Sequence, residues 1–178
     1  MNLPNFLTIL RMIMVPIFII FFYVDMYLVS VIIFAVAAIT DALDGYLARK
    51  NNQITNFGKL MDPLADKILT VSAFICLLDI GLIPAWMVIV ILAREFAITG
   101  LRGVAASEGT VIPAGFSGKL KTVFQMVAII LLLLSLAFPD LSALAVIAQV
   151  VLWIALILTV YSGVEYLWNG RKLLRMDK

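Results

Sequence analysis

Four aspartates stand out in a chain that is otherwise mostly apolar. Asp41 and Asp44 are spaced i, i+3, and Asp62 and Asp66 are spaced i, i+4, so each pair would share one face of a helix. The segment between the pairs is short, which predicts antiparallel neighbouring helices whose four carboxylates converge. Converging carboxylates repel one another, and one or two divalent cations would supply the compensating charge. An all-carboxylate site of this kind suits magnesium or manganese.

A simpler interpretation of the same residues stays open. Asp62 would cap a helix before Pro63, and the other three aspartates would pair with basic side chains nearby in the sequence. Surface pairs of that kind are common, and a single carboxylate would favour this interpretation. Four carboxylates at these two spacings favour the metal site. The candidate partners for the simpler interpretation are Arg49, Lys50, Lys59 and Lys67.

Residue types that are rare or absent exclude several kinds of catalytic and metal site. The sequence contains no histidine, and its single cysteine, Cys76, lies inside an apolar run. Histidine-based acid–base catalysis, histidine metal ligation, an internal disulfide and cysteine-cluster metal sites are therefore excluded. Carboxylates, hydroxyls and basic side chains remain, and a metal held by them would be hard and oxygen-loving.

A second group of candidates consists of basic residues in the second half of the chain. Guanidinium groups bind phosphate bidentately, so this group predicts a phosphate site. The alternative is that these residues only reflect the membrane topology, because Lys and Arg collect on the cytoplasmic side of membrane proteins. Arg94 is the strongest candidate, since we expect it about two turns inside its helix and beside Glu95. The group is Arg94, Arg102, Lys119 and Lys121.

Composition indicates which elements position these residues. Of 178 residues, 64% are hydrophobic and 13% charged, and the mean hydropathy of +1.13 excludes an ordinary soluble domain. We predict an all-α, polytopic membrane protein with six transmembrane helices in one domain over residues 1–178. The first helix lacks the charged start and cleavage site of a signal peptide, so we expect it to be retained. The predicted helices are 6–23, 27–46, 60–78, 84–106, 120–138 and 141–168.

The placement of charge predicts the orientation. All 13 Lys and Arg residues fall at the same side of the predicted helices, while the intervening loops carry Asp25, Asp79 and Asp140 and no basic residue. By the positive-inside rule, both termini and the four aspartates face the cytoplasm across the cell membrane. The tryptophans and tyrosines are interpreted as interfacial anchors or packing residues.

The aspartates belong to a longer pattern. Asp41-Ala-Leu-Asp44-Gly45-Tyr-Leu-Ala48-Arg49, eight residues, and Gly58-Lys-Leu-Met-Asp62-Pro-Leu-Ala-Asp66 match D-x2-D-G-x2-A-R-x8-G-x3-D-x3-D at every fixed position. This pattern resembles the signature of the CDP-alcohol phosphotransferase family. Three flanking segments, at 3–11, 93–102 and 118–122, resemble the phosphatidylglycerophosphate synthase branch of that family. The resemblance covers the chain from Pro4 to the basic tail.

The resemblance implies an architecture and a metal site. It implies six transmembrane helices, usually a homodimer, and a polar cavity open to the cytoplasm. It also implies two divalent metal ions, magnesium or manganese, held by the signature aspartates. By matching positions, the metal ligands are Asp41, Asp44, Asp62 and Asp66, and Asp66 also resembles the general base.

The resemblance further implies a reaction and a nucleotide site. The expected reaction transfers the phosphatidyl group of CDP-diacylglycerol to sn-glycerol 3-phosphate and releases CMP. The basic group described above would then hold the phosphate of the acceptor. Asn5 and Thr8 would either touch the nucleotide or cap and anchor the first helix. The positions that match the CDP pocket are Gly45, Ala48, Arg49 and Gly58.

Two other functions stay open at this stage. A related enzyme with another acceptor, such as phosphatidylglycerol, inositol phosphate or serine, would share the signature and differ in the acceptor pocket. A cation channel or transporter would also place acidic residues in membrane helices. The channel is disfavoured because the first, fifth and sixth predicted helices are almost entirely apolar and the acidic residues lie at one side.

Overall fold

The computed structural model describes residues 3–50, 56–107 and 115–170, and all regular structure within them is helical. The predicted all-α class is confirmed for these residues. Several helices extend up to four residues beyond the predicted bounds, because polar residues form helical hydrogen bonds too. The second helix, for example, was predicted to end at Tyr46, whereas α2 extends to Lys50. The six helices are α1 (Leu3–Tyr23), α2 (Tyr27–Lys50), α3 (Asn56–Asp79), α4 (Ala85–Ser107), α5 (Phe116–Ala137) and α6 (Ser142–Gly170).

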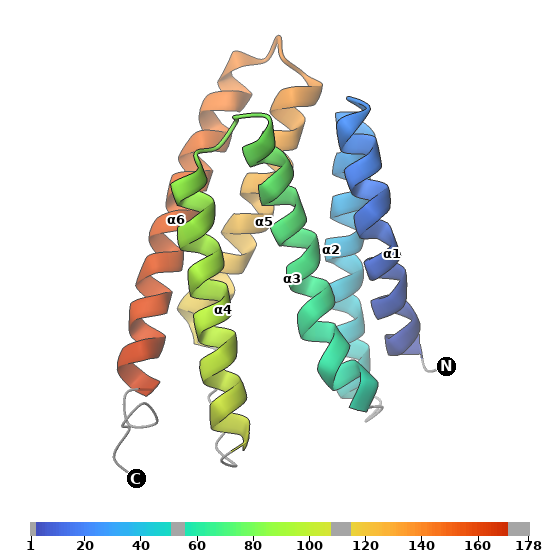
Figure 1. Cartoon of the computed structure of the whole chain (residues 1–178). Helices are drawn as coiled ribbons and strands as arrows, with labels where there is room; N and C mark the ends of the chain where they lie inside the picture. Colours follow the sequence, from blue (N-terminus) through green and yellow to red (C-terminus); the bar gives the residue numbers. More distant parts are fainter. Residues whose placement is uncertain (1–2, 51–55, 108–114, 171–178) are drawn as a thin grey trace.

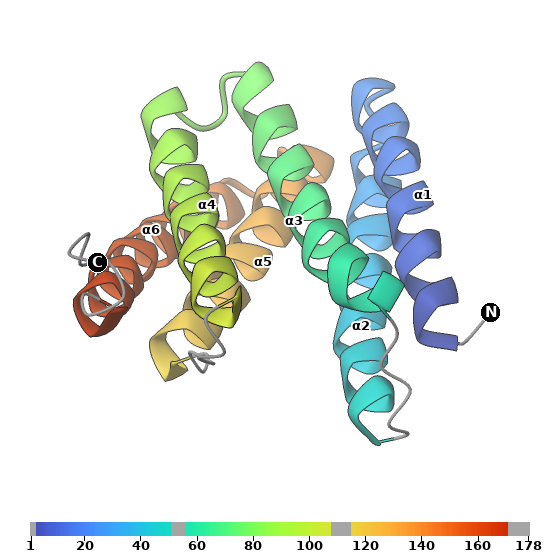
Figure 2. The ribbon, with the colours of Figure 1, turned by 60° about the horizontal axis from the view of Figure 1, so that its bottom comes forward.

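The helices run alternately up and down, so that one end of the bundle gathers the elements that carry the candidate residues. In Figure 1, α1 begins and α6 ends at the lower end, and the α1–α2, α3–α4 and α5–α6 turns lie at the upper end. Figure 2 brings the lower end forward and shows that the end of α2, the start of α3, the end of α4 and the start of α5 all point that way. The structure therefore places both signature segments at the same end as Arg102 and Lys119.

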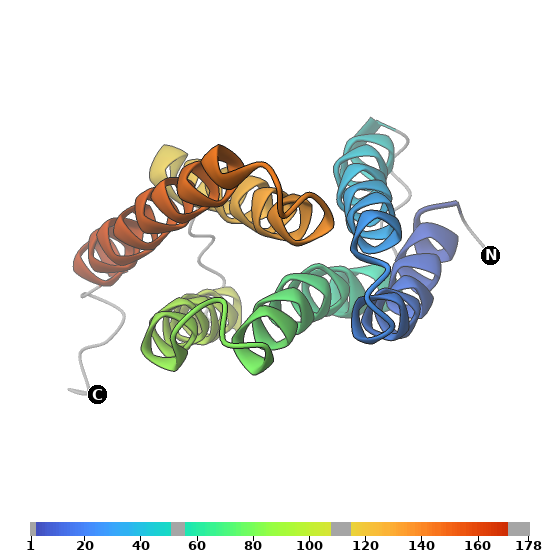
Figure 3. The same ribbon diagram turned by 90° about the horizontal axis from the view of Figure 1, so that it is seen from above.

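Seen from above, the helices form two rows (Figure 3). One row contains α2, α5 and α6, and the other contains α1, α3 and α4. The tightest packing joins α5 to α6, α1 to α2 and α1 to α3, whereas α3 meets α4 and α5 much more loosely. The region between α3, α4 and α5 is therefore less tightly packed than the rest of the bundle.

The turns at the upper end are short and tightly closed. Gly81, with φ of 74°, follows α3, and Asp25, with φ of 58°, follows α1. Both are left-handed conformations, which glycine adopts freely and aspartate tolerates better than most residues. The Tyr23 hydroxyl donates a hydrogen bond of 2.9 Å to Asp79 Oδ2 and so ties the end of α1 to the end of α3. These contacts fix the upper end on the side opposite the candidate site.

The core is apolar and rich in aromatic side chains. The Phe18 ring lies 6.2 Å from that of Phe22 and 6.0 Å from that of Phe34, centroid to centroid, and all three are fully buried. The outward surface is also apolar, as at Ile89 and Ile157, whose side chains are more than 60% exposed. Apolar surface this extensive is typical of a protein that lies in lipid.

Three helices are long and apolar enough to cross a membrane among the residues that the structure describes. They are Phe6–Tyr23 in α1, Phe116–Ala137 in α5 and Ser142–Asn169 in α6, and Tyr27–Thr40 in α2 is a shorter apolar stretch. The expectation of six spans is thus met in part. The other helices differ because they carry the charged residues of interest within their length, for example Arg94 and Glu95 in α4.

Candidate functional site

The four signature aspartates belong to two antiparallel helices that contact each other. Asp41 and Asp44 lie toward the C-terminal end of α2, and Asp62 and Asp66 lie in the N-terminal half of α3. Each pair keeps the helical spacing that puts both residues on one face. Their side chains lie outside the described residues, so the convergence of the carboxylates remains a prediction. The predicted roles of Asn5, Gly45, Ala48, Arg49 and Gly58 stay predictions for the same reason.

The backbone arrangement fits a divalent metal site. Two antiparallel helices that touch only lightly bring the backbone of an i, i+3 pair and of an i, i+4 pair of aspartates to the same end of the bundle. This donor set is all oxygen, as magnesium and manganese prefer. Among the side chains that the structure describes, no group of three or more acidic or cysteine residues could hold a metal elsewhere. The signature aspartates are therefore the candidate ligands.

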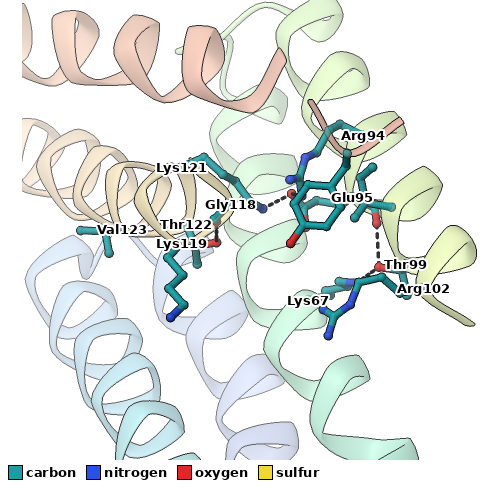
Figure 4. A pocket seen from close by; sticks show the side chains of 12 residues that line it. Lys67, Arg94, Glu95, Thr99, Arg102, Gly118, Lys119, Lys121, Thr122 and Val123 are labelled. Atoms are coloured by element: carbon teal, nitrogen blue, oxygen red, sulfur yellow. Dashed lines mark hydrogen bonds and ion pairs between the residues drawn. The ribbon is translucent and has the colours of Figure 1, made fainter. Parts of the chain in front are cut away.

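A polar pocket of about 360 Å³ opens beside this region, between α3, α4, α5 and α6 (Figure 4). Its α3 wall is Lys67, which directly follows Asp66, so the pocket begins where the signature segment ends. It contains five basic side chains and one carboxylate, that of Glu95. The lining residues are Lys67, Arg94, Glu95, Ile98, Thr99, Arg102, Gly118, Lys119, Lys121, Thr122, Val123 and Tyr166.

Arg94 lies at the back of the pocket and is held from several sides. Its side chain is 10% exposed, its Nη2 donates to Ser162 Oγ at 3.0 Å, and its Nη1 donates to Glu95 Oε1 at 3.3 Å. The guanidinium carbon lies 5.6 Å from the centroid of the Tyr166 ring, within range of a cation–π interaction. Its Nε is buried, and no described group accepts a hydrogen bond from it.

Glu95 joins the basic residues of two helices. Its Oε1 accepts hydrogen bonds from Arg94 on α4 and from Lys121 Nζ on α5, and Figure 4 shows the Lys121 contact. The Lys121 side chain is only 6% exposed, so its charge depends on this carboxylate. One glutamate thus neutralises part of the pocket's charge and leaves the pocket strongly positive.

A second chain of hydrogen bonds ties α3 to α4 near the signature segment. Lys67 Nζ donates to Thr99 Oγ1, and that hydroxyl in turn donates to the Glu95 backbone carbonyl at 2.7 Å. Figure 4 shows Lys67, Thr99 and Arg102 grouped together on one side of the pocket. This connection crosses the loosely packed region between α3 and α4 and links the two helices there.

The structure brings the four predicted phosphate-binding residues onto one pocket. Arg94, Arg102, Lys119 and Lys121 all line it, although α4 and α5 hold them in different ways. Arg94 lies deeper than expected, about three and a half turns from the end of α4 at Ser107. Arg102 and Lys119 are exposed, whereas Lys121 is buried. Their role in binding an acceptor stays a prediction.

Sequence reasoning missed the contribution of α6. Tyr166, interpreted as an anchor or packing residue, is 7% exposed and lines the pocket. Thr159, Ser162, Gly163 and Tyr166 recur at helical spacing on one face, and this polar stripe in an apolar helix was the available signal. Thr8, considered for nucleotide contact or for anchoring, is fully buried in α1, and the choice between these two roles stays a prediction.

The comparisons with known proteins point to one family. The family model of CDP-alcohol phosphatidyltransferase matches residues 1–161. A Bacillus subtilis protein named CDP-diacylglycerol–glycerol-3-phosphate 3-phosphatidyltransferase is 45% identical, and the match covers 96% of this chain and 97% of that protein. A Rickettsia typhi protein of the same name is 40% identical over 93% of this chain and 94% of its own length. A Mycobacterium tuberculosis protein named a probable phosphatidylglycerophosphate synthase is 46% identical over 93% of this chain and 79% of its own length.

Proposed function

Because the chain belongs to the CDP-alcohol phosphatidyltransferase family, we propose that it transfers a phosphatidyl group from CDP-diacylglycerol to sn-glycerol 3-phosphate. The products are phosphatidylglycerophosphate and CMP, so the chain is a phospholipid-synthesising transferase. The relatives named for this reaction match nearly the whole chain, which supports the choice of substrates.

The observation that carries the acceptor assignment is the basic pocket next to the signature segment. Five basic side chains and one carboxylate line it, and two of the basic side chains, Arg94 and Lys121, are at most 10% exposed. Glycerol 3-phosphate carries a dianionic phosphate that needs several cationic donors. An acceptor without a phosphate, such as serine, would leave these charges uncompensated.

We place the reacting groups as follows. Arg94, Arg102, Lys119 and Lys121 hold the acceptor's phosphate, which directs one of its two free hydroxyls toward α3 and Asp66. Asp66 takes the proton of that hydroxyl as the oxygen attacks the lipid-side phosphorus of the diphosphate. The new oxygen–phosphorus bond forms as the bond to the CMP phosphate breaks, and CMP leaves with the electron pair.

The four aspartates hold the metal ions that this chemistry uses. When bound to Asp41, Asp44, Asp62 and Asp66, magnesium or manganese supplies positive charge to the phosphate oxygens. Gly45 and Gly58 carry no side chain, so the phosphates approach the backbone of α2 and α3 closely. Ala48 and Arg49 complete the CDP site on α2, with Asn5 and Thr8 of α1 beside it.

The proposed setting is the cytoplasmic membrane, with all six helices crossing it as one domain over residues 1–178. Besides the three apolar helices, α2, α3 and α4 then cross with most of their charged residues toward the lower end of the bundle. That lower end, with the active site and both termini, faces the cytoplasm. The proposed assembly is a homodimer.

The test is an acceptor panel. Purified protein receives CDP-diacylglycerol and magnesium, with glycerol 3-phosphate, inositol phosphate, phosphatidylglycerol or serine added separately, and CMP release is measured. Release with glycerol 3-phosphate alone supports the proposal. Release with inositol phosphate alone would keep the phosphate pocket and change the acceptor, whereas release with serine alone would contradict both.

A further inference from the structure

The contacts around Arg94 come largely from α6, beyond the part of the chain that the family model matches. That match ends at residue 161, whereas Ser162, Gly163 and Tyr166 follow it directly. We propose that these three residues position Arg94 and thereby set the affinity of the pocket for the acceptor's phosphate. The inference rests on the proposed function for the identity of the acceptor.

Ser162 fixes one end of the guanidinium. Its Oγ accepts the hydrogen bond from Arg94 Nη2 at 3.0 Å and donates its own proton to the Thr159 carbonyl at 3.1 Å. Ser162 is fully buried, and its hydroxyl has one acceptor for its proton and one donor for its oxygen. The orientation of the hydroxyl is therefore determined, and with it the position of Nη2.

Gly163 fixes the stem of the same side chain. A Cβ at this position would lie 3.0 Å from Arg94 Cγ and 4.0 Å from Arg94 Cβ. These are atoms near the root of the side chain, so a methyl group would displace the whole of Arg94 by a few tenths of an ångström. Only glycine lets α4 and α6 approach closely enough for the arginine to take its observed path.

Tyr166 supports the guanidinium and joins it to α5. Its ring lies beside the Arg94 guanidinium, and its hydroxyl accepts a hydrogen bond of 2.8 Å from the Gly115 backbone N–H at the start of α5. A Cβ at Gly118 would lie 3.4 Å from the ring, so α5 packs directly on Tyr166. Lys119 and Lys121 follow within one turn. One side chain of α6 thus sets the spacing between the arginine of α4 and the lysines of α5.

Alanine variants test the inference through ligand binding as well as turnover. The full chain in detergent is titrated calorimetrically with glycerol 3-phosphate, and the KM values for glycerol 3-phosphate and CDP-diacylglycerol are measured in parallel. Ser162→Ala and Gly163→Ala should weaken glycerol 3-phosphate binding about three- to tenfold and leave the KM for CDP-diacylglycerol unchanged. Gly103→Ala is the matched control, because a Cβ there meets nothing within 4 Å and should change neither value.

A double-mutant cycle decides whether the effect passes through Arg94. In an Arg94→Ala background, Ser162→Ala and Gly163→Ala should cause no further loss of binding, because the group they position is gone. Losses that add in full would overturn the inference, and so would single variants that bind like the wild type. Tyr166→Phe keeps the ring but loses the hydrogen bond to Gly115, so it should weaken binding less than Tyr166→Leu, which loses both contacts.

The two readouts separate this inference from the proposed function. A wild-type chain that binds glycerol 3-phosphate but releases no CMP would refute the reaction, and the binding cycle would still test the role of α6. A wild-type chain that binds neither glycerol 3-phosphate nor inorganic phosphate would overturn the inference itself.

Discussion

Replacing Glu95 by glutamine removes one negative charge from the centre of the basic pocket and changes its shape little. Glu95 Oε1 accepts from both Arg94 and Lys121, and the three side chains are 16%, 10% and 6% exposed. The amide oxygen of glutamine still accepts hydrogen bonds, but two nearly buried cations lose their compensating charge. We expect the variant to be less stable without ligand and to gain more stability from phosphate than the wild type does.

The size of the effect follows from the contacts that are weakened. Hydrogen bonds to charged groups contribute about 1.5–3 kcal/mol each, and the amide retains part of both, so we expect a loss of about 2 kcal/mol. For a chain of this size, that corresponds to a fall in Tm of about 4–8 °C. Removing the glutamate's charge also strengthens the pocket's attraction for a dianion, since Ser162 and Tyr166 still hold Arg94. If the variant binds phosphate ten times more tightly, saturating ligand should stabilise it by about 1.4 kcal/mol more than it stabilises the wild type. The ligand-induced rise in Tm would then be about 3–6 °C larger.

The assay is thermal unfolding of the purified protein in detergent, with and without saturating glycerol 3-phosphate. Asp140→Asn is the control, because Asp140 is an exposed carboxylate in the turn at the other end of the bundle. It should change neither Tm nor the ligand-induced shift. The reasoning fails if Glu95→Gln melts like the wild type, or if glycerol 3-phosphate raises its Tm by no more than it raises that of the wild type.

Three further predictions address the metal site, the acceptor site and the orientation. Asp62→Asn should abolish turnover while the protein still inserts, and a chelator should abolish wild-type turnover until magnesium or manganese is restored; full activity in excess chelator would exclude the metal. Arg102→Ala should raise the KM for glycerol 3-phosphate about ten- to a hundredfold with little change for the lipid, and Arg102→Lys should recover only part because it loses the bidentate fork. An equal rise for both substrates would instead assign Arg102 to the diphosphate or the fold. A cysteine placed beside Asp140 should react with an impermeant thiol reagent on intact cells, whereas one beside Lys50 should not, and the reverse labelling pattern would overturn the orientation.

The sequence predicts most of this fold because its main signal is the length and spacing of apolar runs. Those runs locate all six helices, and the short connections make consecutive helices run in opposite directions, although α2 and α3 touch only lightly. The ends are less predictable, as α2 shows: its helix continues to Lys50 because polar residues satisfy helical hydrogen bonds as well as apolar ones do. Which helices pack tightly is also invisible in one sequence, since it depends on side-chain fit between segments far apart in the chain.

Some residues of the candidate site could be predicted from the sequence and others could not. The aspartates and Arg94 are conspicuous because a charge inside an apolar helix is costly, and the pattern alone selects them. Ser162 and Gly163 are not conspicuous, because small residues are common in membrane helices for packing reasons alone. Their relation to Arg94 becomes apparent only when α4 and α6 are placed side by side. The pairing of Glu95 with Lys121 is hidden for the same reason.

The most direct test of the proposed reaction asks whether the carbon atoms of the acceptor become part of the lipid product. Purified protein is given CDP-diacylglycerol, magnesium and glycerol 3-phosphate labelled with carbon-13, and the lipid and aqueous phases are analysed by mass spectrometry. The account predicts labelled phosphatidylglycerophosphate in the lipid phase, formed in equal amount to CMP and absent with Asp62→Asn. CMP release with all of the label left in water, and phosphatidic acid as the lipid product, would contradict it.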